Sequence, residues 1–267
     1  MGNIIEVRNL SKTFKIYKKK LGVKGSLENL FRREYEQLEA VKEISLNISK
    51  GEFVGLIGPN GAGKTTTLKC LSGLIKPTSG EISVLGFNPI ERKREYLKRI
   101  SFVMGNKSQL WWDLPAMETL ELTKVIYDIP QEDYNNRVEE LIELLDLKKL
   151  SSRPVRELSL GQRMKFELIN SLIYIPEVIF LDEPTLGLDI VMQERIRGFL
   201  KKYNKKYGST IILTSHYMAD VESLCSRVIL INKGMVLFDG TIKKLKEKYS
   251  LGKGLTLEDV VKGIFNK

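Results

Sequence analysis

The sequence predicts an α/β fold, in which a parallel sheet is covered by helices and accompanied by an antiparallel β subdomain. Continuous apolar runs such as Val178–Leu181 are typical of strands buried on both faces of a parallel sheet. Stretches with helical periodicity, such as 64–72 and 193–207, lie between these runs and suit the crossover connections of such a sheet. The first strands instead alternate polar with apolar residues between turn residues, which favours antiparallel pairing. The predicted strands are Ile4–Val7, Ile44–Ile48, Phe53–Ile57, Glu81–Leu85, Ile100–Met104, Val178–Leu181, Ile211–Thr214, Val228–Ile231 and Val236–Phe238.

Residues 113–150 carry the strongest helical periodicity, and we expect an α-helical subdomain at about 107–170. The apolar stripe predicted to pack in its core consists of Val138, Leu141, Leu144, Leu145 and Leu150. One large domain is expected over residues 1–240, with a basic insertion at 15–38. A short helical extension is expected at 241–267.

The composition is that of an ordinary globular protein, with 42% hydrophobic residues in a chain of 267. No run of about 18 apolar residues is present, so no segment is expected to span a bilayer. The first residues lack the basic and apolar regions of a secretory signal. Cys70 and Cys225 lie far apart without paired spacing, which argues against a disulfide framework or a zinc site and for a reduced, cytosolic compartment.

The net charge of +10 is compatible with nucleic-acid binding, with attraction to an anionic membrane, or with solubility alone. Much of the excess is local, because residues 15–36 hold seven Lys or Arg against three acids. Further basic runs lie at 201–206 and 243–248. Charge by itself does not choose between these roles.

A glycine-rich segment follows the apolar strand Phe53–Ile57 and opens a helix. It reads Gly58-Pro59-Asn60-Gly61-Ala62-Gly63-Lys64-Thr65, continues into Thr66, and fits the pattern G-x-x-x-x-G-K-[ST]. Its glycines allow successive backbone N–H groups to turn toward phosphate oxygens at the positive end of a helix. Lys64 would reach the outer phosphates, and the Thr65 hydroxyl would hold Mg²⁺. The segment predicts a nucleotide site.

The buried strand at 178–181 ends in two acids, Asp182 and Glu183. At the carboxyl end of a parallel strand, Asp182 is placed to hold the Mg²⁺ shell through water. Glu183, one residue later, is placed to polarise an attacking water. The alternative interpretation is a polar turn.

Three further segments fall in order around these acids, and with them the chain resembles the ATP-binding cassette (ABC) family. They are Leu158-Ser159-Leu160-Gly161-Gln162, Leu188-Asp189 and Thr214-Ser215-His216. The first resembles the family signature LSGGQ, the second its D-loop, and the third its switch histidine, His216. His216 is the only histidine in the chain. The resemblance implies a P-loop NTPase (RecA-like) core that binds Mg-ATP and hydrolyses it, with Glu183 and His216 as catalytic residues.

The resemblance also implies a head-to-tail dimer, in which each ATP lies between the phosphate loop of one subunit and the signature of the other. Ser159, Leu160, Gly161 and Gln162 would therefore meet the γ-phosphate of the partner's ATP. A second nucleotide-binding subunit is the implied partner. A homodimer is expected, and a heterodimer with a sibling subunit stays open. Asp189 is expected to contribute through the D-loop.

Three positions depart from the family pattern or match it loosely. Leu160 stands where the family usually has glycine, and we expect it to be tolerated because the role there is through backbone. Asn106 aligns with the family's Q-loop glutamine, a Mg²⁺ ligand, and is one methylene shorter, with Gln109 as the rival. Phe14 matches the adenine-stacking aromatic best, with Tyr17 second.

Transporter ATPases, iron–sulfur assembly ATPases and nucleic-acid machines all carry these family motifs. The last class predicts coiled-coil insertions, zinc cysteines or two cassettes in one chain. None of these is present, so we expect no nucleic-acid partner. Assembly ATPases and importer subunits stay open as alternatives.

Two adjacent tryptophans, Trp111 and Trp112, are expected to be buried or docked. In the family, this helical lobe receives an integral membrane permease. Together with the signature and the 15–38 insertion, the tryptophan segment resembles ABC-2-type exporter ATPases. The resemblance implies export of a lipid-linked polymer, drug or other amphiphile by a peripheral protein on the inner face of the membrane. The basic insertion is expected to lie against the permease or the anionic leaflet.

Overall fold

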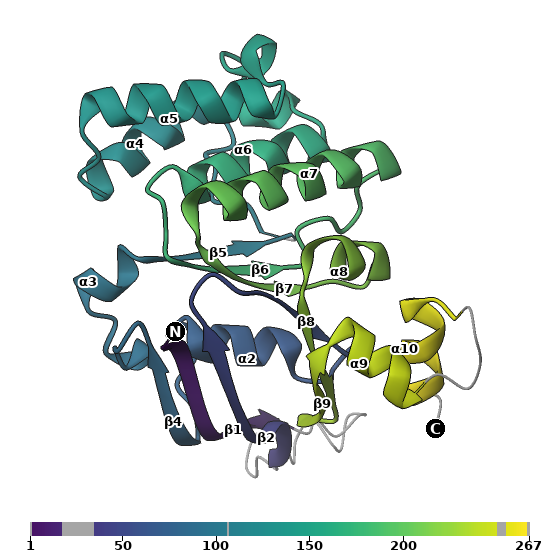
Figure 1. Ribbon diagram of the computed structural model, residues 1–267. Helices are drawn as coiled ribbons and strands as arrows, with labels where there is room; N and C mark the ends of the chain where they lie inside the picture. The colour runs from purple at the N-terminus through teal and green to yellow at the C-terminus, as the bar shows by residue number, and fades with distance from the viewer. Residues whose placement is uncertain (1, 18–34, 106, 250–254, 266–267) are drawn as a thin grey trace, which may run out of the picture.

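The computed structural model describes residues 2–17, 35–105, 107–249 and 255–265, which form two sheets and the helices around them (Figure 1). The strands are β1 Asn3–Tyr17, β2 Tyr35–Ser49, β3 Phe53–Ile57, β4 Ser79–Val84, β5 Ile100–Met104, β6 Val178–Asp182, β7 Thr210–Thr214, β8 Arg227–Asn232 and β9 Met235–Thr241. The α-helices are α2 Lys64–Leu71, α3 Arg94–Leu97, α4 Ala116–Ile126, α5 Gln131–Leu144, α6 Leu160–Leu172, α7 Ile190–Tyr207, α8 Met218–Leu224, α9 Ile242–Tyr249 and α10 Leu257–Phe265. Short 3₁₀ turns lie at η1 Pro89–Glu91, η2 Lys148–Leu150 and η3 Val155–Glu157.

The larger sheet has the strand order β5-β6-β7-β3-β8-β9. Its first five strands pair in parallel, and only β9 is antiparallel to its neighbour. Side chains alternate between its faces. In β6, for example, Phe180 packs into the cluster on the α2 side, whereas Ile179 and Leu181 pack into the cluster on the other side. A strand with apolar residues on both faces is stable only under two covering layers, and the predicted α/β fold class is confirmed.

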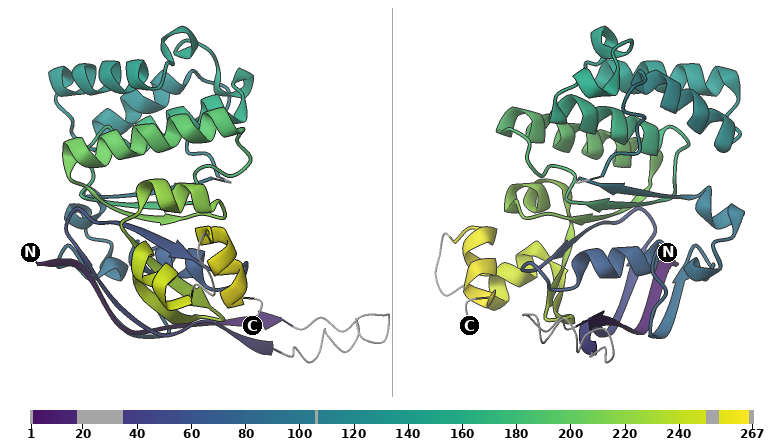
Figure 2. Two further views of the ribbon diagram at one scale, coloured as in Figure 1. Left: turned by 45° about the vertical axis from the view of Figure 1, so that its right-hand side comes forward. Right: turned by 180° about the vertical axis from the view of Figure 1, so that it is seen from behind.

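The helices cover this sheet on both faces (Figures 1 and 2). Helix α2 lies between the larger sheet and the smaller one, while α6 and α7 cover the opposite face, with α4 and α5 stacked beyond them (Figure 1). Among the residues that the structure describes, no helix has the length and apolar character that crossing a membrane requires. The layering leaves the carboxyl ends of β3, β6 and β7 free to carry side chains at one edge.

The smaller sheet is antiparallel, in the order β2-β1-β4, as the alternating pattern of the early strands predicts. Strands β1 and β2 are far longer than predicted, because they stay paired as far as Tyr17 and Tyr35. The two ends of the 15–38 insertion therefore continue a hairpin. The middle of that insertion, 18–34, lies outside the described residues, and with it most of the basic residues expected to face the permease or the anionic leaflet.

Two expectations about exposure need correction. Leu144 was predicted to share the buried stripe of α5, but it is 37% exposed, whereas Val138, Leu141 and Leu145 are buried. The buried stripe runs through Tyr134, Val138, Leu141 and Leu145, and Leu144 lies one residue off that stripe, turned toward solvent. Trp111 and Trp112 lie before α4 rather than on a helix and are about half exposed. Of the two arrangements expected for them, buried or docked, burial within this chain is therefore wrong, and docking onto a partner stays a prediction.

Candidate functional site

The glycine-rich loop joins β3 to α2 and closes around the ammonium group of Lys64. The Nζ atom of Lys64 donates to the backbone oxygens of Gly58, at 2.7 Å, and Pro59, at 3.1 Å. Gly61 and Gly63 adopt positive φ angles of 76° and 106°, which L side chains rarely adopt. No side chain caps the first turn of α2, and no acid lies there. The helix therefore presents its positive end to the loop, as an anion site requires.

The loop is also pressed against two backbone segments, which explains two of its glycines. A Cβ atom on Gly58 would lie 2.0 Å from the Ile231 oxygen, and one on Gly63 would lie 2.4 Å from the Ala40 oxygen. The turn between β8 and β9 adds a bond from the Gly234 N–H to the Ala62 oxygen, at 2.9 Å. Packing from β2 and from this turn therefore holds the loop in shape before any nucleotide arrives.

Asp182, at the end of β6, lies opposite Thr65 at the start of α2. The Thr65 hydroxyl is 3.0 and 2.9 Å from the two carboxylate oxygens of Asp182. The Thr214 hydroxyl, at the end of β7, donates to the same carboxylate at 2.7 Å. Hydroxyl and carboxylate oxygens are the ligands that Mg²⁺ prefers, so the residues present fit this ion.

Glu183 and His216 form a close pair beside this cluster. The Nε2 atom of His216 lies 2.8 Å from Oε1 of Glu183, and both side chains are partly exposed. Glu183 has a φ of 55°, and its N–H donates to the backbone and hydroxyl oxygens of Thr214, each at 3.1 Å. The positive φ turns the Glu183 side chain off the strand direction. The structure thus brings together the acid and the histidine that the sequence placed on separate strands.

The electrostatics of the site suit an anionic ligand. Burial lowers the pKa of Lys64, and the nearby carboxylates of Glu183 and Asp182 raise it in part. The ammonium group is almost fully buried and has only carbonyl oxygens within the loop as acceptors in the contacts described above. Phosphate oxygens would offer it charged acceptors, which bind ammonium more strongly than neutral ones.

Gly105 fixes the distance between β5 and Glu183. Its N–H donates to the backbone oxygen of Asp182 at 2.9 Å, and a Cβ atom at position 105 would lie 2.1 Å from the backbone oxygen of Glu183. This residue is not among those that the sequence pattern predicts for the site. A glycine directly after a buried parallel strand, next to a strand ending in acids, was the available signal.

Replacing Gly105 with Ala should therefore displace Glu183 and lower kcat by about 100-fold, as a shift of about 1 Å in a reacting group can do. The measurement is steady-state phosphate release by the purified protein. The matched control is Gly198→Ala in α7, where a Cβ would meet nothing within 4 Å. Equal rates for the two variants would contradict the positioning role of Gly105.

A buried carboxylate, Asp220 of α8, ties the segments after β6 and β7 together. It accepts from the Thr185 hydroxyl at 2.5 Å and from the Ser215 hydroxyl at 2.7 Å. Its other oxygen accepts from Arg197 of α7 at 2.7 Å. Thr185 lies two residues after Glu183, and Ser215 directly precedes His216. Asp220 therefore holds in place the backbone next to both Glu183 and His216.

The signature residues open α6 in the layer opposite α2 (Figure 1). Ser159 and Gln162 form a capping box: the Ser159 hydroxyl accepts from the Gln162 N–H at 3.3 Å, and the Gln162 side chain accepts from the Ser159 N–H at 2.9 Å. A Cβ on Gly187 would touch the Leu160 side chain at 3.1 Å, and one on Gly161 would meet Met192 at 2.9 Å. Residues 160 and 161 thus pack against Gly187 and Met192, which flank Leu188 and Asp189.

Several predicted positions lie around the edge of the site. Asp189 caps α7 by accepting from the Met192 N–H at 2.8 Å. Phe14 is half-buried on β1, with the Lys12 ammonium 5.0 Å from its ring centre, and Tyr17 pairs with Tyr35 instead.

Of the two candidates for the Q-loop residue, Asn106 and Gln109, only Gln109 is among the described residues. Asn106 lies outside the described residues, although its neighbour Gly105 contacts Asp182 and Glu183. The Gln109 side chain donates to the Phe102 oxygen at 3.0 Å, which directs its amide onto β5.

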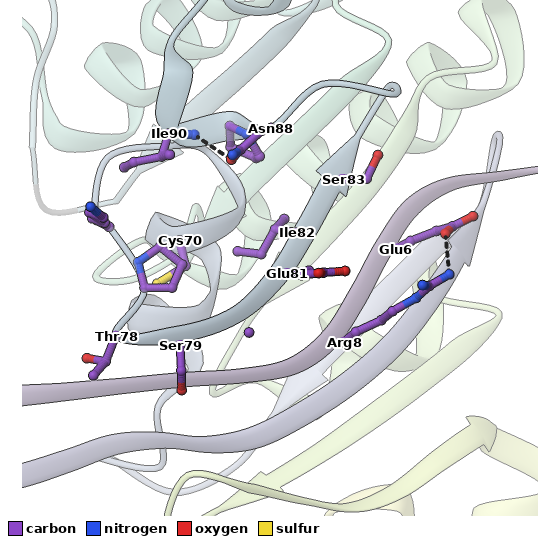
Figure 3. A pocket seen from close by; sticks show the side chains of 14 residues that line it. Glu6, Arg8, Cys70, Thr78, Ser79, Glu81, Ile82, Ser83, Asn88 and Ile90 are labelled. Atoms are coloured by element: carbon purple, nitrogen blue, oxygen red, sulfur yellow. Dashed lines mark hydrogen bonds and ion pairs between the residues drawn. The ribbon is translucent and has the colours of Figure 1, made fainter.

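A cavity of about 620 Å³ lies away from this chemistry, between β1, β4 and η1 (Figure 3). Its walls carry the exposed pair Glu6 and Arg8, with the buried Cys70 behind them. Burial raises the pKa of the Cys70 thiol to about 11, so this group is an unreactive thiol at neutral pH. The cavity contains none of the phosphate-loop residues.

Comparisons with known proteins agree with this geometry. The family model described as "ABC transporter" matches residues 41–186. The chain is 35% identical to the ABC transporter ATP-binding protein NatA of Bacillus subtilis, over 81% of this chain and 88% of that protein. It is 34% identical to the bacitracin transport ATP-binding protein BcrA of Bacillus licheniformis, over 80% and 70% of the two chains.

Solved structures give the same result. A dimeric structure of the ATP-binding cassette MJ0796, bound to ADP and phosphate, is 28% identical and has a TM-score of 0.73, over 89% of this chain and 98% of that one. The ATP-binding subunit of an ABC transporter has a TM-score of 0.78 at 24% identity, over 96% and 97% of the two chains, and supports the fold. The chain therefore belongs to the ABC transporter family, as an ATP-binding subunit that hydrolyses ATP.

Proposed function

We propose that this ATPase works as a head-to-tail dimer that powers export through membrane permease subunits. The observation that carries the proposal is the division of the nucleotide site within one chain. The phosphate loop, Asp182, Glu183 and His216 gather at the edge of the larger sheet, whereas the signature opens α6 on the opposite side of that sheet from α2 (Figure 1). A second subunit would bring its own signature to this half-site.

The residues of the half-site suggest how hydrolysis would proceed. The loop N–H groups and Lys64 would hold the phosphates. Glu183 would take a proton from a water molecule as the oxygen of that water attacks the γ-phosphorus. ADP leaves as the bond to the γ-phosphoryl group breaks. His216 keeps Glu183 oriented. Thr65 and Asp182, with Asn106 as the proposed third ligand, would hold Mg²⁺, which supplies charge neutralisation on the β- and γ-phosphates.

Exposed apolar side chains next to the signature and D-loop support the dimer. Leu160 and Leu186 are 38% and 39% exposed, and Ile190 and Val191 are 73% and 61% exposed. A cluster of this kind beside polar signature residues is typical of a surface that another protein covers. The dimeric structures among the relatives support a second copy of a cassette as the partner.

A second exposed apolar surface supports the permease. Trp111 and Trp112 are 51% and 53% exposed, and Leu122, Val125 and Ile126 of α4 are also exposed. We call these five residues the docking surface. A groove of about 370 Å³ is lined by Leu74, Gln109 and Tyr127 among others, and the last two lie close in the chain to Trp111 and Ile126. The names of the relatives support export of an amphiphile, because they include bacitracin transport, linearmycin resistance and probable multidrug proteins.

Replacing both tryptophans of the docking surface with Ala should weaken permease binding about 30-fold, which corresponds to a tryptophan hot spot of about 2 kcal/mol. The measurement is co-purification from membranes with the membrane protein encoded beside this gene. The control is the double variant Met235→Ala, Leu237→Ala on β9, which removes a comparable exposed pair.

Equal recovery of both double variants would contradict the docking surface. The direction of transport has its own readout in inside-out vesicles that contain the complex. If the complex exports, labelled bacitracin accumulates in these vesicles when ATP is added outside. ATP-dependent release of preloaded compound would instead indicate import.

A further inference from the structure

Glu167 is a carboxylate buried in α6, eight residues after the signature serine. Its exposed fraction is 3%. Its Oε1 atom accepts from the Ser108 hydroxyl, from the Gln109 N–H at 2.8 Å and from the Leu110 N–H at 3.3 Å. The Oε1 atom of Glu167 on α6 thus bonds all three residues 108–110, which directly precede Trp111.

Holding a carboxylate at this place is costly. Burial raises the pKa of Glu167, and the bonds from residues 108–110 together with the Arg163 charge lower it in part. A leucine or methionine of similar volume would fill the same space without the desolvation cost. Core packing therefore does not explain why this position is acidic, whereas the need for a hydrogen-bond acceptor for three neighbouring donors does.

The same segment is joined to the start of the signature helix at other points. The Arg156 N–H donates to the Trp112 oxygen at 3.0 Å, and the Val155 N–H donates to the Leu114 oxygen at 3.0 Å. The Arg163 guanidinium lies 5.3 Å from the ring centre of Trp112. The segment 108–114 therefore contacts the segment 155–167 near both of its ends, at residues 155 and 156 and at residues 163 and 167.

Helix α6 can transmit a displacement because it is one continuous helix with a capped first turn. Ser159 caps its first turn, and Asn170 bonds the Thr123 hydroxyl of α4 at 2.6 Å. Glu167 lies eight residues beyond Ser159, a distance of about 12 Å along a rigid helix. A movement of the tryptophan segment that carried Glu167 would carry Ser159 with it.

We propose that Glu167 is a positioning residue, whose carboxylate fixes the signature helix to residues 108–110 and so links the docking surface to Ser159. The inference rests on the proposed head-to-tail dimer, in which Ser159 contacts the partner's nucleotide. None of the hydrogen bonds described for Glu167 reaches the phosphate loop, so it acts on turnover through the signature rather than through Lys64 or Thr65.

The test compares Glu167→Leu, which removes the acceptor, with Glu167→Gln, which keeps an oxygen at the same place. The leucine variant should lose about tenfold in kcat, as the loss of a charged hydrogen bond can cause. Its KM for ATP should change less than about twofold, because uniform ATP binding is untouched. The glutamine variant should recover most of the rate.

Lys165→Met is the matched control. Lys165 is equally buried in the same helix, but its Nζ atom donates to the Leu145 oxygen at 2.7 Å, away from residues 108–110. This variant should keep the wild-type kcat. If it loses as much rate as Glu167→Leu, the effect is a general loosening of α6 and the proposal fails.

Tryptophan fluorescence reads the segment directly, because Trp111 and Trp112 are the only tryptophans in the chain. Glu167→Leu should increase their quenching by acrylamide, and neither Glu167→Gln nor Lys165→Met should do so. If Glu167→Leu does not fold, Ser108→Ala replaces it, since this exposed residue supplies one of the three donors. A kcat loss of about threefold is expected there.

Wild-type kcat in Glu167→Leu, or failure of Glu167→Gln to recover the rate, would overturn the proposal. Failure of the dimer itself has a different outcome: Ser159→Arg would then keep its full rate. The two ideas can therefore fail separately.

Discussion

Glu183→Gln should lower the rate of ATP hydrolysis by about 10²- to 10⁴-fold, the usual contribution of a general base, while ATP binding persists. The amide cannot accept the proton of the attacking water. Its oxygen can still face His216, which lies 2.8 Å from Oε1 of Glu183 in the wild-type protein. Lys64 and Thr65 are unchanged, so the nucleotide is still held.

The variant should consequently accumulate as an ATP-bound dimer. Phosphate release measures the loss of turnover, and size-exclusion chromatography with and without Mg-ATP measures the dimer. The control is Glu222→Gln, which neutralises a carboxylate of α8 that bonds Lys246 at the surface. A Glu183→Gln protein that stays monomeric with ATP and turns over at the wild-type rate would overturn the catalytic assignment.

Ser159→Arg should abolish hydrolysis by a different route, because the bulky cation would stand where the partner's γ-phosphate is expected. Ser159 forms its cap with Gln162 on α6 and has no described hydrogen bond to the phosphate loop. The monomer should therefore bind a fluorescent ATP analogue with unchanged Kd. Ser223→Arg, at an exposed position on α8, is the control for the added charge.

Complementation makes this test decisive. Lys64→Ala and Ser159→Arg should each be inactive alone, since one lacks the phosphate loop lysine and the other the signature serine. A mixed dimer contains one composite site with both groups intact. An equal mixture should recover roughly a quarter of the wild-type rate if the chains pair at random in a two-fold dimer. No recovery, or loss of ATP binding by monomeric Ser159→Arg, would contradict the in-trans role.

The sequence by itself determined the local chemistry of this protein. The glycines of the phosphate loop, the acids Asp182 and Glu183, and the serine that caps α6 could be predicted because each depends on short-range geometry. Positive φ, a strand end and a helix cap are properties of a few consecutive residues. The fold class could be predicted for a related reason: burial on two faces leaves a continuous apolar run in a strand.

Only the tertiary structure decided which groups meet. The order β5-β6-β7-β3-β8 places strands distant in sequence next to one another, and so brings Thr214 to Asp182 and His216 to Glu183. The close approach of Gly105 to Glu183 and the hydrogen bonds of Glu167 to residues 108–110 arise in the same way. Periodicity identifies the buried face of one element. It does not identify the neighbouring element, because that depends on how separate elements pack. The same packing leaves Leu144 and both tryptophans exposed.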